Sequence, residues 1–518
     1  MQPIPIIDLF AGPGGLGEGF TSVVDKKNNR VFRIALSIER DEFAHRTLTL
    51  RSFLRQFPHK KFPKEYYQFV RDEIKDVQEL YKLYPKEAAN AKHEVWKISL
   101  GSPNDHKEID RRITAGLKGE INFVLIGGPP CQAYSLVGRA RRQEGNGLNK
   151  EDERVYLYRE YYRILGVHKP PVFIMENVKG LLSSKIDNKS VFRQLIQDLQ
   201  NPVESYRKLE GKDDIKSKTK YRIFSLVKKP IEYDLIDGSP IYDAKDFVIQ
   251  AEKYGIPQTR HRVILLGIRN DIDVTPEMLI PGSKLIPVED VISGLPSLRS
   301  GLSKTKDGKQ EWKQAMEGIV NTILKNQIDK DVWEKMLQVV NNLSIPRKDR
   351  GDSFIEWQNK VDYQPSWYLD NKLKGACNHE TRSHIVQDLY RYLFVSCFAK
   401  VKGRSPKLSD FPKLLLPKHE NVNKGIEENK FADRFRTQLY GQPSKTVTSH
   451  ISKDGHYFIH PDSAQCRSMT VREAARIQTF PDNYYFCGPR TEQFHQVGNA
   501  VPPLLAQQIA SIVQKLFD

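Results

Sequence analysis

Two short polar stretches, each directly after an apolar run, carry the side chains best suited to covalent chemistry. Cys131 stands in Gly128-Pro-Pro-Cys-Gln132, after the apolar residues 123–126. Proline fixes φ and restricts the residue before it, so the two prolines would hold the cysteine in one orientation. Glu176 stands in Glu176-Asn-Val178, after the apolar residues 172–175. A lone cysteine after a strand is equally compatible with a plain turn, so the surrounding elements must decide between a nucleophile and an incidental thiol.

The apolar runs before Cys131 and Glu176 both have the composition of buried strands of the parallel type. In open α/β sheets ligands bind beyond the carboxyl ends of the strands. We therefore expect Cys131 and Glu176 to face one crevice at the same edge of a sheet.

A glycine-rich stretch near the start of the chain predicts a nucleoside-binding turn. Gly12, Gly14 and Gly17 follow an apolar strand (4–10) and precede a helical stretch, which satisfies the G-x-G-x-x-G pattern. A second predicted strand, 32–38, ends in Glu39, about 20 residues past the glycines, where an acid can accept hydrogen bonds from ribose hydroxyls. The pattern fits NAD and S-adenosylmethionine equally, because both contain an adenosine ribose.

The bulk composition indicates a large basic protein with polyanionic partners. The chain has 518 residues, with 81 Lys and Arg against 64 Asp and Glu, a net charge of +17. Such an excess favours nucleic acid, and the length favours two domains. Five scattered cysteines fit a reducing compartment, and no membrane span or secretory signal is visible, so we expect a cytoplasmic protein.

The remaining elements place further candidates along the chain. Residues 41–97 have a helical pattern, 246–249 and 263–268 read as the last strands of the sheet, and strand–helix alternation stops near residue 271. Arg260 and Arg262 alternate along an extended segment and should point to opposite sides. We also predict a short strand (446–448) with a hairpin turn, a helix capped by Thr470, and a final helix (504–516). Cys377, His379 and His384 could begin a metal site, but no second cysteine pair completes it, so we expect no metal.

Six of these stretches, in this order, resemble the motifs of the cytosine-C5 DNA methyltransferases. They are Asp8-Leu-Phe-Ala-Gly-Pro-Gly-Gly15, Gly128-Pro-Pro-Cys-Gln132, Glu176-Asn-Val178, Gln258-Thr-Arg-His-Arg262, Arg472-Glu-Ala-Ala-Arg476 and Gln496-Val-Gly-Asn-Ala-Val501. The resemblance covers about residues 4–270 and 465–518. It implies an α/β fold with a seven-stranded, mostly parallel, Rossmann-like methyltransferase sheet, and a final helix that packs beside the first motif.

The resemblance also implies a division into two domains. Residues 1–270 plus 465–518 would form the catalytic domain, and residues 271–464 a smaller target-recognition domain that binds DNA. Double-stranded DNA would be the substrate of a monomeric enzyme, bound between the two domains. The family's usual restriction–modification setting would add a cognate restriction endonuclease as a functional counterpart.

The family's residue roles carry over to matching positions of this sequence. Cys131 matches the nucleophile that adds to C6 of cytosine, Glu176 the group that donates a proton or hydrogen bond to N3, and Arg262 the arginine on the O2 side of the ring. The target base would be flipped out of the duplex to reach them. The cofactor would be S-adenosyl-L-methionine, held by Phe10, Gly12, Gly14, Glu39, Pro129, Leu157, Asn499 and Val501. Where the family often has an adenine-contacting Asp, this chain reads Trp96-Lys-Ile-Ser-Leu-Gly101, so no such contact is assigned.

Three alternatives stay open at this point. An RNA cytosine-C5 methyltransferase would share the architecture. An NAD-dependent dehydrogenase would explain the glycine pattern but neither Pro-Pro-Cys nor Glu-Asn-Val. A non-catalytic relative that only binds DNA is the third alternative. The presence of every catalytic residue of the family in this sequence argues against it.

Overall fold

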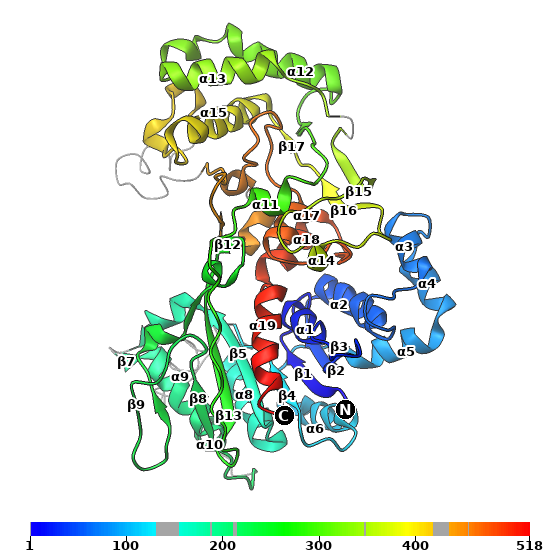
Figure 1. Ribbon diagram of the computed structural model, residues 1–518, viewed down its shortest axis with the longest axis vertical. Helices are drawn as coiled ribbons and strands as arrows, with labels where there is room; N and C mark the ends of the chain where they lie inside the picture. The colour runs from blue at the N-terminus through cyan, green and yellow to red at the C-terminus, as the bar shows by residue number, and fades with distance from the viewer. Residues whose placement is uncertain are drawn as a thin grey trace.

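The computed structural model describes residues 2–130, 155–186, 189–210, 215–346, 349–417, 435–453 and 455–518. Cys131 and the basic segment 133–147 lie outside the described residues. Figure 1 shows a sheet flanked by helices in the lower part of the molecule and a group of helices in the upper part, with α17 and α18 between them.

The central sheet follows the order β11-β13-β5-β4-β1-β2-β3, and β8 pairs with β13 as an eighth strand beside this path of seven. The four pairings among β1 to β5 along this path are parallel, whereas β13 runs antiparallel to β5, β8 and β11. The sheet is therefore mostly parallel, as expected, with β8 added to the seven strands that the resemblance implied. The strands are β1 (Ile4–Leu9), β2 (Phe32–Glu39), β3 (Val95–Lys97), β4 (Val124–Ile126), β5 (Val172–Val178), β8 (Tyr221–Phe224), β11 (Val248–Gln250) and β13 (His261–Arg269).

The strand register brings three loops to one edge of the sheet. Asp8 of β1 is opposite Ile126 of β4, and Ile126 is opposite Ile174 of β5. Each of these strands ends within a few residues of this row. The polar residues that follow them must therefore meet at the carboxyl edge, the place where open α/β sheets bind ligands.

Alternation along the strands divides the core into two layers. Ile6, Ile34 and Val124 face a cluster with α1 and α19, whereas Ile7, Leu36 and Leu125 face a cluster with α6, α8 and α9. A Cβ on Gly19 would lie 2.4 Å from the Cβ of Ala506, so α1 and α19 touch through backbone, as expected of the final helix. The covering helices are α1 (Gly15–Thr21), α19 (Pro503–Gln514), α6 (His106–Leu117), α8 (Val155–His168), α9 (Val191–Gln200) and α10 (Pro202–Glu210).

The predicted helical region 41–97 forms its own aromatic-rich layer beside the sheet. Phe53 contacts Phe57, Tyr81 and Tyr84 with ring centroids 5.2 to 6.1 Å apart. These aromatic side chains form one buried cluster, so the interleaved aromatics serve packing. The helices are α2 (Glu42–Arg55), α3 (Lys64–Val70), α4 (Val77–Leu83) and α5 (Pro85–Glu94).

The middle of the chain builds a separate apolar core. Trp312, Trp333 and Tyr392 are buried in a cluster that draws on residues 302–466. Its main helices lie in the upper part of Figure 1. They are α12 (Lys309–Glu317), α13 (Lys330–Asn341) and α15 (Val386–Lys402), with a hairpin of β15 (Gly351–Glu356) and β16 (Gly375–Glu380) nearby.

One local prediction is wrong. Residues 446–448 do not form a strand; the strand is β18 (Ser444–Lys445), paired in parallel with β12 (Gln258–Thr259), and a 3-10 turn (Ser449–Ser452) follows it. The side chain of Gln258 accepts a hydrogen bond from the Val447 nitrogen, so contacts with the segment around β12 draw residues 446–448 out of a hairpin. The other short elements are α11 (Glu289–Ile292), α14 (Pro365–Tyr368), α17 (Val471–Ile477), α18 (Arg490–Asn499), β6 (Lys185–Ile186), β7 (Lys189–Ser190), β9 (Glu232–Tyr233), β10 (Pro240–Ile241), β14 (Gly301–Leu302) and β17 (Ser383–His384).

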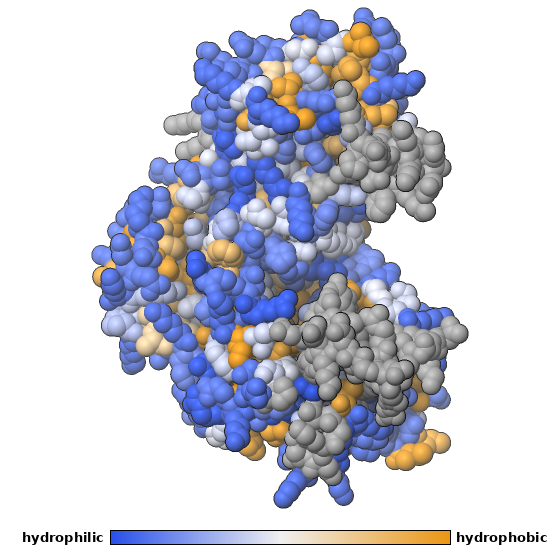
Figure 2. All heavy atoms as spheres, turned by 180° about the vertical axis from the view of Figure 1, so that it is seen from behind, coloured by the Kyte–Doolittle hydropathy of each residue, from blue (hydrophilic) through white to orange (hydrophobic). Residues whose placement is uncertain are grey.

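The described part of the face in Figure 2 is mostly hydrophilic. Figure 2 shows a concave side between the upper group of helices and the lower, sheet-containing part. Among the described residues, no helix combines the length and the apolar character needed to cross a membrane. No cluster of three or more potential metal ligands occurs in the same part of the chain.

Candidate active site

A pocket of about 420 Å³ lies at the carboxyl edge of the sheet, where β1, β2, β4 and β5 end. We call it the strand-end pocket. Phe10 and Gly12 reach it from the loop after β1, Glu39 from the end of β2, Pro129 from the loop after β4, and Glu176 from β5. Two loops and two strand ends that are far apart in the sequence thus converge on one cavity, because the strand register brings them together.

Glu39 ties the glycine-rich loop to the end of β2. Its carboxylate accepts a hydrogen bond from the Gly12 nitrogen and another from the Asp41 nitrogen, each at 2.7 Å. Burial raises the pKa of Glu39. Gly12 has φ +56, a left-handed conformation that favours glycine. The acid therefore sits on the pocket wall with lone pairs remaining for a hydroxyl donor.

Gly14 is not on the pocket wall. It caps the start of α1 with φ +92, and a Cβ there would lie 2.7 Å from Leu48 and 3.1 Å from the Tyr484 hydroxyl. The glycine is needed for the turn into α1 and for close packing against α2 and the chain's C-terminal part. Gly14 therefore supports the turn between Pro13 and Gly15, which do line the pocket, and its cofactor contact stays a prediction.

The other wall of the pocket comes from α8 and from the end of the chain. Leu157 is buried in α8, and Asn499 lies at the end of α18 with its amide 3.3 Å from the ring of His495. Val501 packs by its backbone against the glycine loop, because a Cβ on Gly15 would lie 2.2 Å from the Val501 oxygen. All of the sequence-predicted cofactor residues except Gly14 therefore line one cavity.

Glu176 and Arg262 form an ion pair at the mouth of this arrangement. Arg262 Nε lies 2.9 Å from Glu176 Oε1, and the two side chains are 14% and 20% exposed. Glu176 is opposite Ile264 in the antiparallel pairing of β5 with β13, so Arg262 is its diagonal neighbour on the same face. The carboxylate and the guanidinium hold each other in orientation while both keep access to solvent.

Arg260 lies on the other side of the segment, as its alternation with Arg262 predicts. It is 1% exposed and donates hydrogen bonds to the carbonyls of Val447 at 2.6 Å and Gly498 at 3.2 Å. Burial, together with nearby Arg262, lowers the pKa of Arg260 to about 9. Arg260 ties the segment to the C-terminal part of the chain and does not reach the strand-end pocket.

The turn that leads into Cys131 is fixed from three sides. The Pro129 carbonyl accepts hydrogen bonds from Asn177 Nδ2 at 3.0 Å and from the Tyr158 hydroxyl at 3.3 Å. A Cβ on Gly127 would lie 1.8 Å from the Leu9 oxygen, and one on Gly128 would lie 2.2 Å from the Glu176 oxygen. Only glycines allow this approach, so the chain enters position 131 from a rigid base against β1 and β5.

Comparison with known proteins assigns the family. The family model of C-5 cytosine-specific DNA methylase matches residues 94–202 and 237–515. The chain belongs to this family. The methylase is 30% identical over 532 aligned positions to the type II methyltransferase M.Bpa9945I of Bacillus paralicheniformis, an alignment that covers 99% of each chain.

Two further relatives of the methylase are more distant. The type II methyltransferase M.DdeI of Desulfomicrobium norvegicum is 25% identical, over 99% of this chain and 89% of that protein. The DNA (cytosine-5-)-methyltransferase M.ApeKI of Aeropyrum pernix is 25% identical, over 78% of this chain and 83% of that protein. Membership of the DNA methylase family leaves the dehydrogenase alternative without support, because the alignment with a type II methyltransferase covers 99% of this chain.

The structure adds wall residues of the methylase that sequence reasoning missed. Ile98, Ser99 and Leu100, from the stretch after β3 to which no contact was assigned, line the strand-end pocket, as do Arg40 and Asp41 after Glu39. Both groups of residues directly follow a strand that ends at the carboxyl edge of the sheet, and this position could have predicted that they line a ligand site. Asn177 was also missed as the partner of Pro129, although it stands beside Glu176 in the sequence.

Asp8 is the least expected side chain at this site of the methylase. It is 1% exposed, it lies on the pocket wall, and both of its carboxylate oxygens lack a hydrogen-bond partner among the described residues. Burial raises the pKa of Asp8 to about 8, although Arg55 acts in the opposite direction. The buried carboxyl of Asp8, without a hydrogen-bond partner among the described residues, therefore favours its protonated form.

Proposed function

We propose that this methylase transfers a methyl group from S-adenosyl-L-methionine to carbon 5 of a cytosine within a specific duplex DNA sequence. The observation that carries the proposal is the convergence of the Glu176–Arg262 ion pair, the fixed turn before Cys131 and the Glu39 carboxylate around one pocket. Family membership supports cytosine C5 as the methylated position.

The strand-end pocket fits S-adenosylmethionine by the chemistry of its wall. Glu39 has acceptor capacity left for ribose hydroxyls, and Phe10, Ile98 and Leu157 offer apolar surface to the adenine. A volume of about 420 Å³ lies within the range of small-molecule sites. When bound, S-adenosylmethionine would supply an electrophilic methyl group.

The protein's own groups would activate the base. Carbon 5 of cytosine is a weak nucleophile, and addition of the Cys131 thiolate to C6 makes it enamine-like. Addition moves electron density towards N3, where Glu176 would supply a proton or hydrogen bond, and Arg262 would stabilise the O2 side of the ring electrostatically. The Glu176–Arg262 pair keeps both groups on one side of the base. C5 would then take the methyl group that the bound cofactor supplies, and removal of the C5 proton by a base would break the bond between C6 and the Cys131 sulfur.

Access to C5 and C6 requires that the base leave the duplex, since both atoms are covered by stacking and base pairing. We propose that residues 271–464 form the target-recognition domain and that residues 1–270 with 465–518 form the catalytic domain. The separate apolar core within residues 302–466 supports a second domain, while Leu279, Val291 and Val447 pack into the core of the sheet. The concave side visible in Figure 2 is the place for the duplex of a monomeric enzyme.

A restriction–modification setting follows from the relatives. Those described above include two named type II methyltransferases, one of them aligned over 99% of both chains. We propose that this enzyme protects DNA in the cytoplasm against a cognate restriction endonuclease with the same recognition sequence.

The deciding experiment incubates the full chain with mixed-sequence duplex DNA and S-adenosylmethionine and maps 5-methylcytosine by sequencing. Methylation confined to one short sequence context is expected, and Cys131→Ala should abolish it while cofactor binding, measured by calorimetry, persists. Methylation of tRNA in place of duplex DNA would assign the RNA alternative. Activity retained in Cys131→Ala would refute the covalent mechanism.

A further inference from the structure

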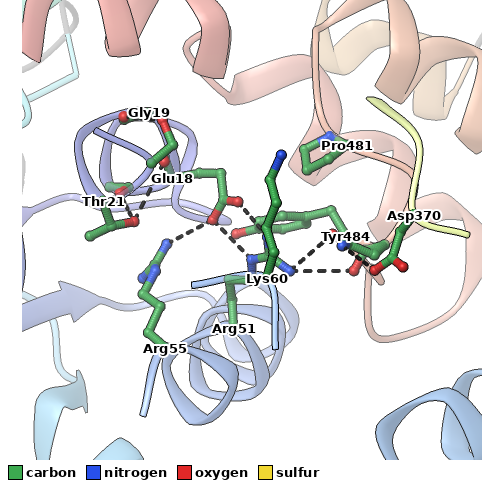
Figure 3. Close-up of polar contacts among 12 residues, drawn as sticks. Glu18, Gly19, Thr21, Arg51, Arg55, Lys60, Asp370, Pro481 and Tyr484 are labelled. Carbon is green, nitrogen blue, oxygen red and sulfur yellow. Dashed lines mark hydrogen bonds and ion pairs between the residues drawn. The ribbon is translucent and has the colours of Figure 1, made fainter. Parts of the chain in front are cut away.

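A second cavity, of about 260 Å³, shares no wall residue with the strand-end pocket. We call it the basic cavity. Its wall comes from the end of α1, from α2 and the following stretch 55–62, from residues 367–372, and from Pro481 and Asn483. Figure 3 shows Arg51 and Arg55 from α2 reaching Glu18, with Lys60, Asp370 and Pro481 around them.

Cations outnumber acids on this wall. The acids are Glu18 and Asp370. The cations are Arg30, Arg51, Arg55, Lys60 and Lys372. A cavity of this composition has a positive potential, which favours an anionic occupant.

Both acids are already satisfied. Glu18 accepts from Arg51 in a two-point contact and from Arg55 Nη2 at 3.2 Å. Burial by itself would raise the pKa of Glu18, but the two arginines more than offset this and lower it to about 2. Asp370 accepts from the Tyr67 hydroxyl at 2.8 Å and from Asn483 Nδ2 at 2.7 Å. Glu18 is therefore held by two of the five cations, whereas Asp370 keeps its charge beside neutral partners, and the wall still has an excess of positive charge.

The cations keep unused donors. The Arg55 side chain is only 8% exposed, and its Nε is buried without a hydrogen-bond partner among the described residues. Arg30 donates through Nη1 to the carbonyls of Arg55 and Phe57, and it makes no ion pair within the described part of the chain. Lys60 Nζ donates to the carbonyl of Ser366 at 2.7 Å. Guanidinium groups with free donors suit the oxygens of a phosphate.

Burial, with neighbouring positive charges, lowers the pKa of two titratable groups on this wall. Burial, with Arg55 adding to it, lowers the pKa of Arg30 to about 10. Burial, then Arg30 and Lys60, lowers the pKa of His59 to about 4, so its imidazole is neutral at physiological pH. A bound anion would relieve the repulsion among these groups and would raise the pKa of His59.

We propose that the basic cavity binds a phosphate-type oxyanion carried on a small molecule, a phosphate monoester or pyrophosphate. A small ligand is favoured over the backbone of a duplex because Arg51 and Glu18 lie inside, each with under a tenth of the side chain exposed. The ligand would contact α2 and residues 367–372 together, and so would hold these two segments in place.

Calorimetric titration of the full chain with inorganic pyrophosphate, at constant ionic strength, tests the proposal. Saturable binding is expected, and Lys60→Gln or Arg30→Gln should each weaken it by about tenfold, the typical effect of losing one charge-assisted hydrogen bond. Lys61→Gln is the matched control, since Lys61 is exposed and is not on the cavity wall. Heat no different from that of added KCl, or an equal loss in Lys61→Gln, would overturn the proposal. Lys60 is exposed, so its variant stays informative if Arg30→Gln misfolds.

A second measurement locates the anion. The His59 imidazole resonance, assigned by its loss in His59→Gln, should titrate with a higher pKa when pyrophosphate is present. An unchanged pKa of His59 would place the anion elsewhere and refute the assignment. If non-specific duplex DNA displaces pyrophosphate, the cavity binds a phosphate of the DNA backbone and the proposal of a small ligand is wrong. If pyrophosphate still binds in the presence of saturating DNA, the proposal of a small ligand is supported.

Discussion

At the scale of residues, Glu176 and Arg262 form one ion pair in which each orients the other, with Glu176 on the wall of the strand-end pocket. Arg262→Lys keeps the charge but loses the planar fork, so we predict a fall in kcat of about 10²-fold with little change in KM for the cofactor. Steady-state methylation kinetics measure this. Arg269→Lys is the matched control, because Arg269 ends the same strand and pairs with Asp271 at the surface. Equal losses in both variants would show that strand β13, and not the pair, is what matters.

Asp8 gives a prediction about stability and pH. Its pKa is raised from 3.8 to about 8 in the folded chain, so the folded state binds a proton that the unfolded state releases above pH 4. The contribution of Asp8 to the free energy of unfolding is therefore fully present below about pH 4 and is lost as the pH rises towards 8. We predict that Asp8→Asn unfolds like the parent near pH 4 and is more stable by about 1–3 kcal/mol near pH 8.5. Urea unfolding at both pH values is the measurement.

The control for this prediction is Asp362→Asn, in which an exposed carboxylate is removed. It should leave the pH dependence of unfolding as it is in the parent. A pH dependence that is the same in Asp8→Asn as in the parent would mean that Asp8 is ionised in the folded protein.

At the scale of elements, the contact between α1 and α19 positions the glycine loop. A Cβ on Gly19 would lie 2.4 Å from both the Ala506 Cβ and the Pro503 oxygen. We predict that Gly19→Ala lowers the free energy of unfolding by about 1–3 kcal/mol, because backbone cannot yield as a side chain does. Gly180→Ala, where nothing lies within 4 Å of the added Cβ, should change it little in the same denaturant series. Equal stability of the two variants would mean that the helices separate at no cost.

At the scale of the whole molecule, the net charge of +17 predicts how DNA binding responds to salt. The logarithm of the association constant should fall linearly with the logarithm of KCl concentration, by about 0.9 for each phosphate neutralised. Fluorescence anisotropy with a labelled duplex measures the slope. A duplex without the target sequence should show a slope of similar size at lower affinity. An affinity independent of KCl would contradict recognition driven by phosphate contacts.

The sequence by itself determined the order and type of most elements of the catalytic half. The strand before Cys131, the strand that contains Glu176, the glycine turn and the Thr470-capped helix α17 depend on local periodicity, glycine and proline positions, and end caps. The family motifs added the candidate roles. These features are encoded over short stretches, so neighbouring residues suffice to predict them.

Only the tertiary structure decided what lies next to what. It moved Gly14 off the pocket wall, brought Ser99 onto it, drew residues 446–448 out of a hairpin, and joined Arg30 to Lys372 in one basic cavity. Such placements depend on packing and hydrogen bonds between segments hundreds of residues apart, for which a single chain's periodicity holds no signal. The burial that raises the pKa of Asp8 is of the same kind, because desolvation comes from the whole assembled core.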